Sequence, residues 1–251
     1  MWQELKYMEP TTLYILLIVF VATLVRSTFG FGESLIAVPL LIFFIPIETA
    51  VTLSVLLSIV IAAVVVVQDK RLVYFYSAKW LIIYALIGIP LGLYLLIYGN
   101  EKLIKATLGI IIILYSTYSF FSKTRIQLKS DSKTWLFVCG FLSGVFGGAY
   151  GINGPPLIIY GNLRNWSAQH FRATLQSYFL VASTVGMLGY WYKGLWSSTV
   201  NYYFLLSLPV ILPTIFLGRY LNRRLKDNAF LKYVYVGLIC IGMVLLKQSI
   251  F

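Results

Sequence analysis

The chain has 251 residues, of which 60% are hydrophobic and 11% charged, and its mean hydropathy is +0.86. A soluble domain carries about a quarter charged residues, so this composition excludes one and predicts an all-α polytopic membrane protein. The net charge of +12 does not indicate nucleic-acid binding. The basic residues lie between long apolar runs, as they do in the cytoplasmic loops of membrane proteins, and no nucleic-acid partner is expected.

Six uninterrupted apolar segments are each long enough to cross a hydrocarbon core of roughly 30 Å as a helix. They cover 47–67, 78–98, 102–121, 168–192, 199–221 and 229–249. Two other apolar segments, 12–45 and 134–161, are interrupted by glycine-rich stretches. Irregular backbone at membrane depth is tolerated only where it is buried in protein or lines a cavity. These two breaks are therefore the strongest indication of a site.

The two breaks belong to an internal repeat. Phe29-Gly30 and Phe146-Gly147 lie 117 positions apart, and Gly109 and Gly237 lie 128 apart, with intermediate matches at intermediate spacings. A spacing that grows along the chain is expected of a duplicated unit that gained residues in its loops. The sequence therefore predicts three parts. These are a first half-repeat over 1–121, a basic cytoplasmic linker over 122–133 and a second half-repeat over 134–251.

The charge distribution favours one topology. If each broken segment crossed fully, there would be eight crossing helices and the basic residues would divide almost evenly between the two sides. If each segment instead turns at its glycines and leaves on the side it entered, most basic residues fall on one side, as the positive-inside rule expects. We therefore predict two inverted repeats, each a glycine-broken re-entrant hairpin plus three transmembrane helices. Eight crossing helices are the alternative.

The returning arm of each hairpin predicts an anion site. Asn153 is a candidate N-cap with Pro155 just inside the helix start, and Glu33 opens the returning segment 34–45. A helix N-terminus carries about half a positive charge and several free N–H groups, which together attract anions. The glycines expected to let a ligand approach the backbone are Gly30, Gly32, Gly147, Gly148, Gly151 and Gly154. The alternative is that these glycines only permit close helix packing.

The charged and polar side chains near the breaks complete the predicted site. A charge buried in a membrane segment is costly and is a functional candidate for that reason. Arg26 and Arg172 are expected to attract the anion, and Glu33 to carry a proton. Protons are therefore the candidate coupling ion, with coupling to the membrane potential as the alternative. The alternative for the first segment is a mutual ion pair of Arg26 with Glu33. Tyr150, Asn153 and Gln176 are expected to orient the ligand.

An enzyme is not expected. The only histidine is His170, at the predicted start of a span, and no paired carboxylates lie at membrane depth. His170 is interpreted as a surface residue at a helix start, with a proton relay as the alternative. Cys139 and Cys240 lie inside apolar segments without the spacing of a metal site or a disulfide. Neither a metal nor another cofactor is predicted, and the lipid bilayer and a small anion are the expected partners, with a homodimer left open.

The same residues resemble the sulfite exporter TauE/SafE family of membrane permeases. The likeness covers nearly the whole chain and rests on FGFG at 29–32, AVPLL at 37–41, GGAYGINGPPL at 147–157 and FRATL at 171–175. Asn153 and Glu33 depart from the residues usual in that family. The resemblance implies a multi-pass plasma-membrane transporter that moves small sulfur-containing anions, such as sulfite or organosulfonates, generally outward. An anion channel, or a permease for a different small anion, is the alternative.

Overall fold

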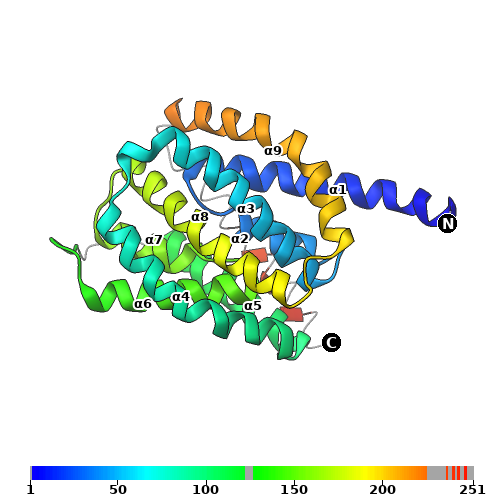
Figure 1. Ribbon diagram of the computed structural model, residues 1–251, viewed down its shortest axis with the longest axis horizontal. Helices are drawn as coiled ribbons and strands as arrows, with labels where there is room; N and C mark the ends of the chain where they lie inside the picture. Colours follow the sequence, from blue (N-terminus) through cyan, green and yellow to red (C-terminus); the bar gives the residue numbers. More distant parts are fainter. Residues whose placement is uncertain are drawn as a thin grey trace.

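The computed structural model describes residues 2–121 and 127–224, together with 236, 239–240, 242–243 and 246–247. All regular elements in these residues are helical, as the sequence predicted. The α-helices are α1 (Trp2–Phe29), α2 (Glu33–Leu41), α3 (Ile47–Asp69), α4 (Phe75–Tyr98), α5 (Glu101–Phe121), α6 (Lys133–Tyr150), α7 (Gly154–Leu163), α8 (Ala168–Tyr192) and α9 (Ser198–Arg224), with the 3-10 turn η1 (Lys70–Leu72) after α3. Figure 1 shows them as one bundle.

The bundle is that of a membrane protein. Four described segments are long and apolar enough to cross a membrane: Pro10–Phe29, Ile47–Leu72, Phe75–Tyr98 and Ser198–Asn222. Helices α5 and α8 occupy two more of the predicted spans, and the predicted span 229–249 lies largely outside the described residues. Large apolar side chains such as Leu17, Ile87 and Leu205 are exposed on the bundle surface, where lipid is the matching solvent for them.

The first broken segment folds back on itself. α1 ends at Phe29, and the chain turns through Gly30 and Gly32, whose φ angles of 88° and 98° are left-handed. Glycine adopts such angles without steric cost. α2 then returns beside α1, and the ring of Phe44 beyond its end stacks on Tyr14 with centroids 5.4 Å apart. The segment is therefore a hairpin, although α1 alone is long enough to cross a membrane.

The second broken segment forms a hairpin as well. α6 ends at Tyr150, Gly151 takes a left-handed φ of 68°, and α7 begins at Gly154. The Leu128 amide, ahead of α6, donates a hydrogen bond of 2.7 Å to the carbonyl of Leu163 at the end of α7. Both ends of the segment thus lie together. The irregular part is shorter than predicted, since α6 continues as helix through its glycines, which pack tightly against neighbouring groups.

The helix pairing places the two hairpins in equivalent surroundings. α4 packs against α6, and α9 packs against α1. A Cβ at Gly92 would collide with the backbone of α6 at Val145, and one at Gly218 would collide with Ser27 of α1. Leu91-Gly92 and Leu217-Gly218 stand 126 positions apart, within the range of spacings of the predicted repeat. Each predicted half therefore packs this glycine against the hairpin of the other half. The inverted repeat and its boundaries stay predictions, and residues 122–126 of the linker lie outside the described part.

Candidate functional site

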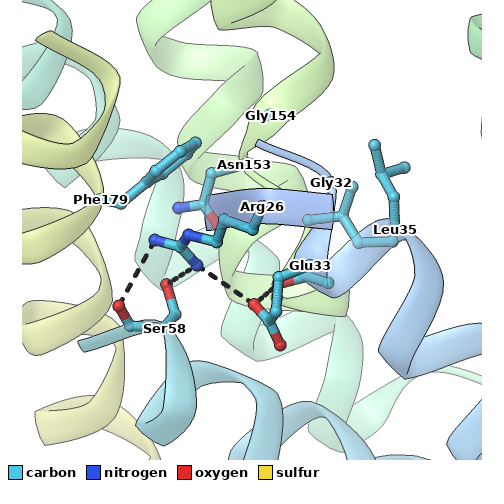
Figure 2. Close-up of a pocket in the computed structure, with 11 residues that line it drawn as sticks. Arg26, Gly32, Glu33, Leu35, Ser58, Asn153, Gly154 and Phe179 are labelled. Atoms are coloured by element: carbon cyan, nitrogen blue, oxygen red, sulfur yellow. Dashed lines mark hydrogen bonds and ion pairs between the residues drawn. The ribbon is translucent and has the colours of Figure 1, made fainter. Parts of the chain in front are cut away.

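The two breaks in the chain line one pocket. Its walls come from the end of α1, the start of α2, the middle of α3, the turn before α7 and from α8 (Figure 2). The lining residues are Arg26, Gly32, Glu33, Ser34, Leu35, Ser58, Gly151, Ile152, Asn153, Gly154 and Phe179. Six residues that the sequence analysis expects at the site are among them: Arg26, Gly32, Glu33, Gly151, Asn153 and Gly154. The helix N-termini at Glu33 and Gly154 therefore meet at the same small space, as the anion-site prediction requires.

Arg26 is the central side chain of this pocket. It is 3% exposed, and its guanidinium lies between Ser58 and Glu33 (Figure 2). Its N–H groups donate to Glu33 Oε2 at 3.2 Å, to Ser58 Oγ at 2.7 Å and to Gln176 Oε1 at 2.9 Å. The ring of Phe179 lies 4.8 Å from its guanidinium carbon. Because a buried charge is tolerated only when paired and hydrogen-bonded, this network is what keeps Arg26 at depth.

Glu33 is the matching negative charge, and it is 1% exposed. Its Oε2 accepts from Arg26 and from the Ser34 hydroxyl at 2.9 Å, and its Oε1 accepts from the Ser54 hydroxyl at 2.9 Å. The ion pair weighed in the sequence analysis is therefore present. Arg26 and Glu33 are the only charged side chains that line the pocket among the described residues. With both ionised, the pocket has no net side-chain charge.

The two helix starts offer unequal numbers of amide donors. The amides at 33–35 have no backbone acceptor among the described residues, as expected in the first turn of a helix. At α7 the first turn contains Pro155 and Pro156, which carry no N–H. Asn153 occupies the predicted N-cap position, but its side chain makes no capping hydrogen bond. The first hairpin therefore supplies most of the free amides, a difference that the sequence analysis did not anticipate.

Several predicted residues lie beside the pocket rather than in its wall. A Cβ at Gly147 would lie 2.5 Å from the Asn153 Nδ2, and one at Gly148 would collide with the Ile89 carbonyl of α4. Tyr150 shares a hydrogen bond with Thr107 of α5. Gly148 therefore fits the alternative that the glycines only permit close helix packing. Gly147 leaves room for the side chain of Asn153, which lines the pocket. Pro155 contributes through the shape of the α7 start.

Gln176 and Arg172 lie on one face of α8, one turn apart, and have different surroundings. Gln176 accepts from Arg26 and donates from Nε2 to the Gly30 carbonyl at 2.8 Å, so it fastens the first turn to the pocket. Arg172 lines a separate pocket and pairs with Asp69 at 3.9 Å. A Cβ at Gly30 would lie 3.1 Å from the Arg172 Cα. The tip of the first hairpin therefore lies between the central pocket and the pocket that Arg172 lines.

His170 lies in the first turn of α8. Its Nδ1 is 2.8 Å from the Ser167 hydroxyl, and its ring stacks on Tyr74 with centroids 4.7 Å apart. It does not line the central pocket. This placement agrees with its interpretation as a residue at a helix start.

The sequence analysis missed several contributors, among them two serines of α3 and one aromatic ring of α8. Ser54 and Ser58 hold Glu33 and Arg26, and Phe179 covers the guanidinium. The two serines stand four positions apart in an otherwise apolar span, and that spacing places them on one helix face. A pair of hydroxyls at this spacing was the available signal. Phe179 carries no such signal, because aromatic residues are common throughout these spans.

The pocket is small in this conformation. The space at its centre is about 20 Å³, which is enough for roughly one water molecule. A small oxyanion needs more room than this. The hairpin starts must therefore move apart, or the Arg26 network must rearrange, before an anion can contact the guanidinium and the α2 amides together.

The fold and this pocket define a helical membrane protein whose polar site lies between two hairpins. The family model described as Sulfite exporter TauE/SafE matches residues 15–245, so the chain belongs to the sulfite exporter TauE/SafE family. Members of this family are membrane transporters, and membership suggests transport of sulfur-containing anions such as sulfite. Comparisons with curated proteins and with solved structures found no match.

Proposed function

We propose that the protein is a secondary transporter of small sulfur-containing oxyanions, such as sulfite or organosulfonates, and works mainly as an exporter in the plasma membrane. The observation that carries the proposal is the pocket built from both hairpin starts around Arg26. A buried guanidinium beside a helix N-terminus has the charge and donors for an oxyanion. Family membership supplies the sulfur-containing class of substrate.

Transport requires the site to face each side in turn. The base of the first hairpin at Phe44 comes just before the start of α3, and the base of the second at Asp131 accepts a hydrogen bond from Ser77 at the start of α4, just past the end of α3. This placement supports hairpins that enter the bundle from opposite ends. Alternating access in inverted-repeat transporters moves one repeat against the other around a fixed central site. We infer that a shift of α2 relative to α3, α7 and α8 would widen the pocket and open it to one side.

We further propose that Glu33 takes up a proton when the anion binds. With Arg26 and Glu33 both charged, an added anion would leave an uncompensated negative charge in the interior, which is costly. Protonation of Glu33 leaves Arg26 to balance a monovalent anion. The proton and the anion would then move together as a neutral set, and net export would be driven by a higher concentration of the anion inside the cell. The oxygens of Glu33 already face Ser34 and Ser54, whose hydroxyls can accept or donate.

Purified protein in proteoliposomes tests the transport proposal. Loaded vesicles should exchange labelled sulfite in a saturable manner and accumulate it against its gradient when a pH gradient is imposed. Sulfoacetate, thiosulfate and sulfate as competitors define the substrate. Flux that neither saturates nor runs uphill would instead establish the anion channel. Absence of any anion flux in protein that remains folded would refute the proposed function.

The variant Glu33→Gln isolates the proton step. It retains a polar side chain beside Arg26 and removes the titratable group, so we expect sulfite exchange to persist while pH-driven accumulation is lost. Ser34→Ala is the matched control, because it removes one hydrogen bond to Glu33 but keeps the carboxyl group. Accumulation driven by pH in Glu33→Gln equal to that of the native protein would refute the role of Glu33.

A further inference from the structure

A second polar pocket lies outside the site described above. It opens where α3 and α9 end and α8 begins, and its volume is about 130 Å³, well above the roughly 10–15 Å³ that one water molecule needs on the same measure. Its lining residues are Asp69, Leu72, Gln169, Arg172, Arg219 and Asn222. We call it the α3–α8–α9 pocket. It is several times larger than the central one.

The α3–α8–α9 pocket has an excess of positive charge. Asp69 lies between two arginines, with its Oδ1 3.2 Å from Arg219 and its Oδ2 3.9 Å from Arg172. One carboxylate therefore faces two guanidinium groups, and the lining carries a net charge of +1. Arg172 is 4% exposed, so solvent screens its charge little. An oxyanion would find two guanidinium groups and two side-chain amides in this pocket.

The α3–α8–α9 pocket is also connected to the central site. The Asn222 Nδ2 donates to the Thr28 carbonyl at 2.6 Å in the tip of the first hairpin. One turn along α8 from Arg172, Gln176 holds both Gly30 and Arg26. A ligand that changes the position of α8 or α9 here therefore acts on the hairpin tip that separates this pocket from the central one.

We propose that the α3–α8–α9 pocket is a second anion-binding site, where an incoming oxyanion replaces the Asp69 carboxylate between Arg172 and Arg219. The proposal rests on the proposed transport function and adds a site to it. While Asp69 bridges the arginines, it ties α3 to α8 and α9 at this end of the bundle. An oxyanion that takes over the arginines releases Asp69, so binding loosens the three helices at the moment when the anion is ready to move inward.

Apparent affinity measured separately from each side of the membrane tests this site. We expect Arg219→Gln to raise the KM for sulfite about tenfold, the effect of losing one charge-assisted hydrogen bond. The rise should occur only at the side that bears the ends of α3 and α9, with the maximal rate unchanged. Arg219→Lys should recover part of the loss. Asp69→Asn should lower the KM, because it removes the competing carboxylate.

Arg71→Gln is the matched control, since Arg71 is exposed in η1 at the same end but does not line this pocket. It should leave the KM within twofold of the native value. An unchanged KM in Arg219→Gln, or an equal rise on both sides, would overturn the second site while transport by the native protein still upheld the proposed function.

A direct binding measurement distinguishes the second anion site from the transport function if the purified protein carries no anion. Isothermal titration of sulfite into the purified full chain should give two binding events in the native protein and one in Arg219→Gln. If the native protein carries no anion but shows this difference, the second site stands and the transport proposal fails. Identical titrations of the two proteins would refute the second site.

Discussion

The two hairpins share a shape and differ in chemistry. The α1–α2 hairpin carries the buried pair Arg26–Glu33 and the larger set of free amides. The α6–α7 hairpin contributes no charged side chain to the central pocket and begins its returning arm with two prolines. Its charges are at the base, where Asp131 pairs with Arg164 at 3.1 Å. We conclude that the first hairpin supplies the electrostatics of the site and the second supplies a fixed neutral wall.

The difference extends to how each hairpin is held. Along α6, small residues let α4 approach to backbone contact, as at Gly144, where a Cβ would lie 2.8 Å from the Ala85 Cα. Along α1 there is one such approach, where Gly218 of α9 meets Ser27. The tips of both hairpins also accept side-chain hydrogen bonds, from Gln176 at Gly30 in the first and from Tyr190 at Gly148 in the second, so the first hairpin has the smaller share of packed backbone. Polar contacts of this kind have alternatives when a ligand arrives, and packed backbone does not. The first hairpin is therefore the one that we expect to move.

The largest expected effect is all-or-none and concerns the shape that both hairpins share. In a background with Cys139 and Cys240 replaced by Ala, single cysteines are introduced at the hairpin bases and treated with an impermeant thiol reagent. Pro10→Cys and Phe44→Cys should react from one side, and Ser130→Cys and Asn162→Cys from the other. Reaction of Ser130→Cys and Asn162→Cys from opposite sides would show that the second segment crosses the bilayer, and the inverted-hairpin topology would be wrong.

The next prediction compares the stability lost by a substitution in the charged first hairpin with that lost by one in the neutral second hairpin. Arg26→Gln leaves Glu33 buried without its cation, which costs about 3–5 kcal/mol. Asn153→Ala in the second hairpin removes a neutral polar group and should cost only about 0.5–1.5 kcal/mol. Thermal unfolding in detergent compares the two. The double variant Arg26→Gln/Glu33→Gln should recover most of the stability but not transport, since the guanidinium is still missing.

Equal unfolding temperatures for Arg26→Gln and the native protein would contradict this comparison. So would a double variant no more stable than Arg26→Gln alone, because the loss would then come from packing of the Arg26 side chain and not from an unpaired charge.

A smaller effect distinguishes the two glycine breaks. Gly32 has a left-handed φ of 98°, so Gly32→Ala should cost roughly 1–2 kcal/mol of stability. Gly154 lies in the first turn of α7, and a Cβ there would meet only Ile158, at an ordinary 3.7 Å. Gly154→Ala should therefore be neutral or stabilise by up to about 1 kcal/mol. Thermal unfolding in detergent measures both variants. A larger loss of stability in Gly154→Ala than in Gly32→Ala would show that the glycine is required at 154 and not at 32.

How much of this site the sequence predicts depends on how far apart along the chain the interacting residues lie. The turns at Gly30–Gly32 and Gly151 follow from local glycine content, and the helix start at Gly154 follows from the prolines beside it. The partners of Arg26 do not follow, because Gln176 lies 150 positions away and meets it only once α8 is packed. The separation of Arg172 from the central pocket likewise depends on Asp69, whose position is set by the length of α3.

The smallest expected difference is between two serines that each support one hairpin, Ser58 of α3 and Ser143 of α6. Ser58 accepts from the Arg26 guanidinium at 2.7 Å, and Ser143 donates to the Asn153 carbonyl at 2.6 Å. A hydrogen bond to a charged group contributes about 1.5–3 kcal/mol and a neutral one about 0.5–1.5 kcal/mol. Ser58→Ala should therefore lower the unfolding temperature more than Ser143→Ala, and only Ser58→Ala should also raise the KM for sulfite. Equal losses of stability, with no change in KM for either variant, would mean that the first hairpin is as purely structural as the second.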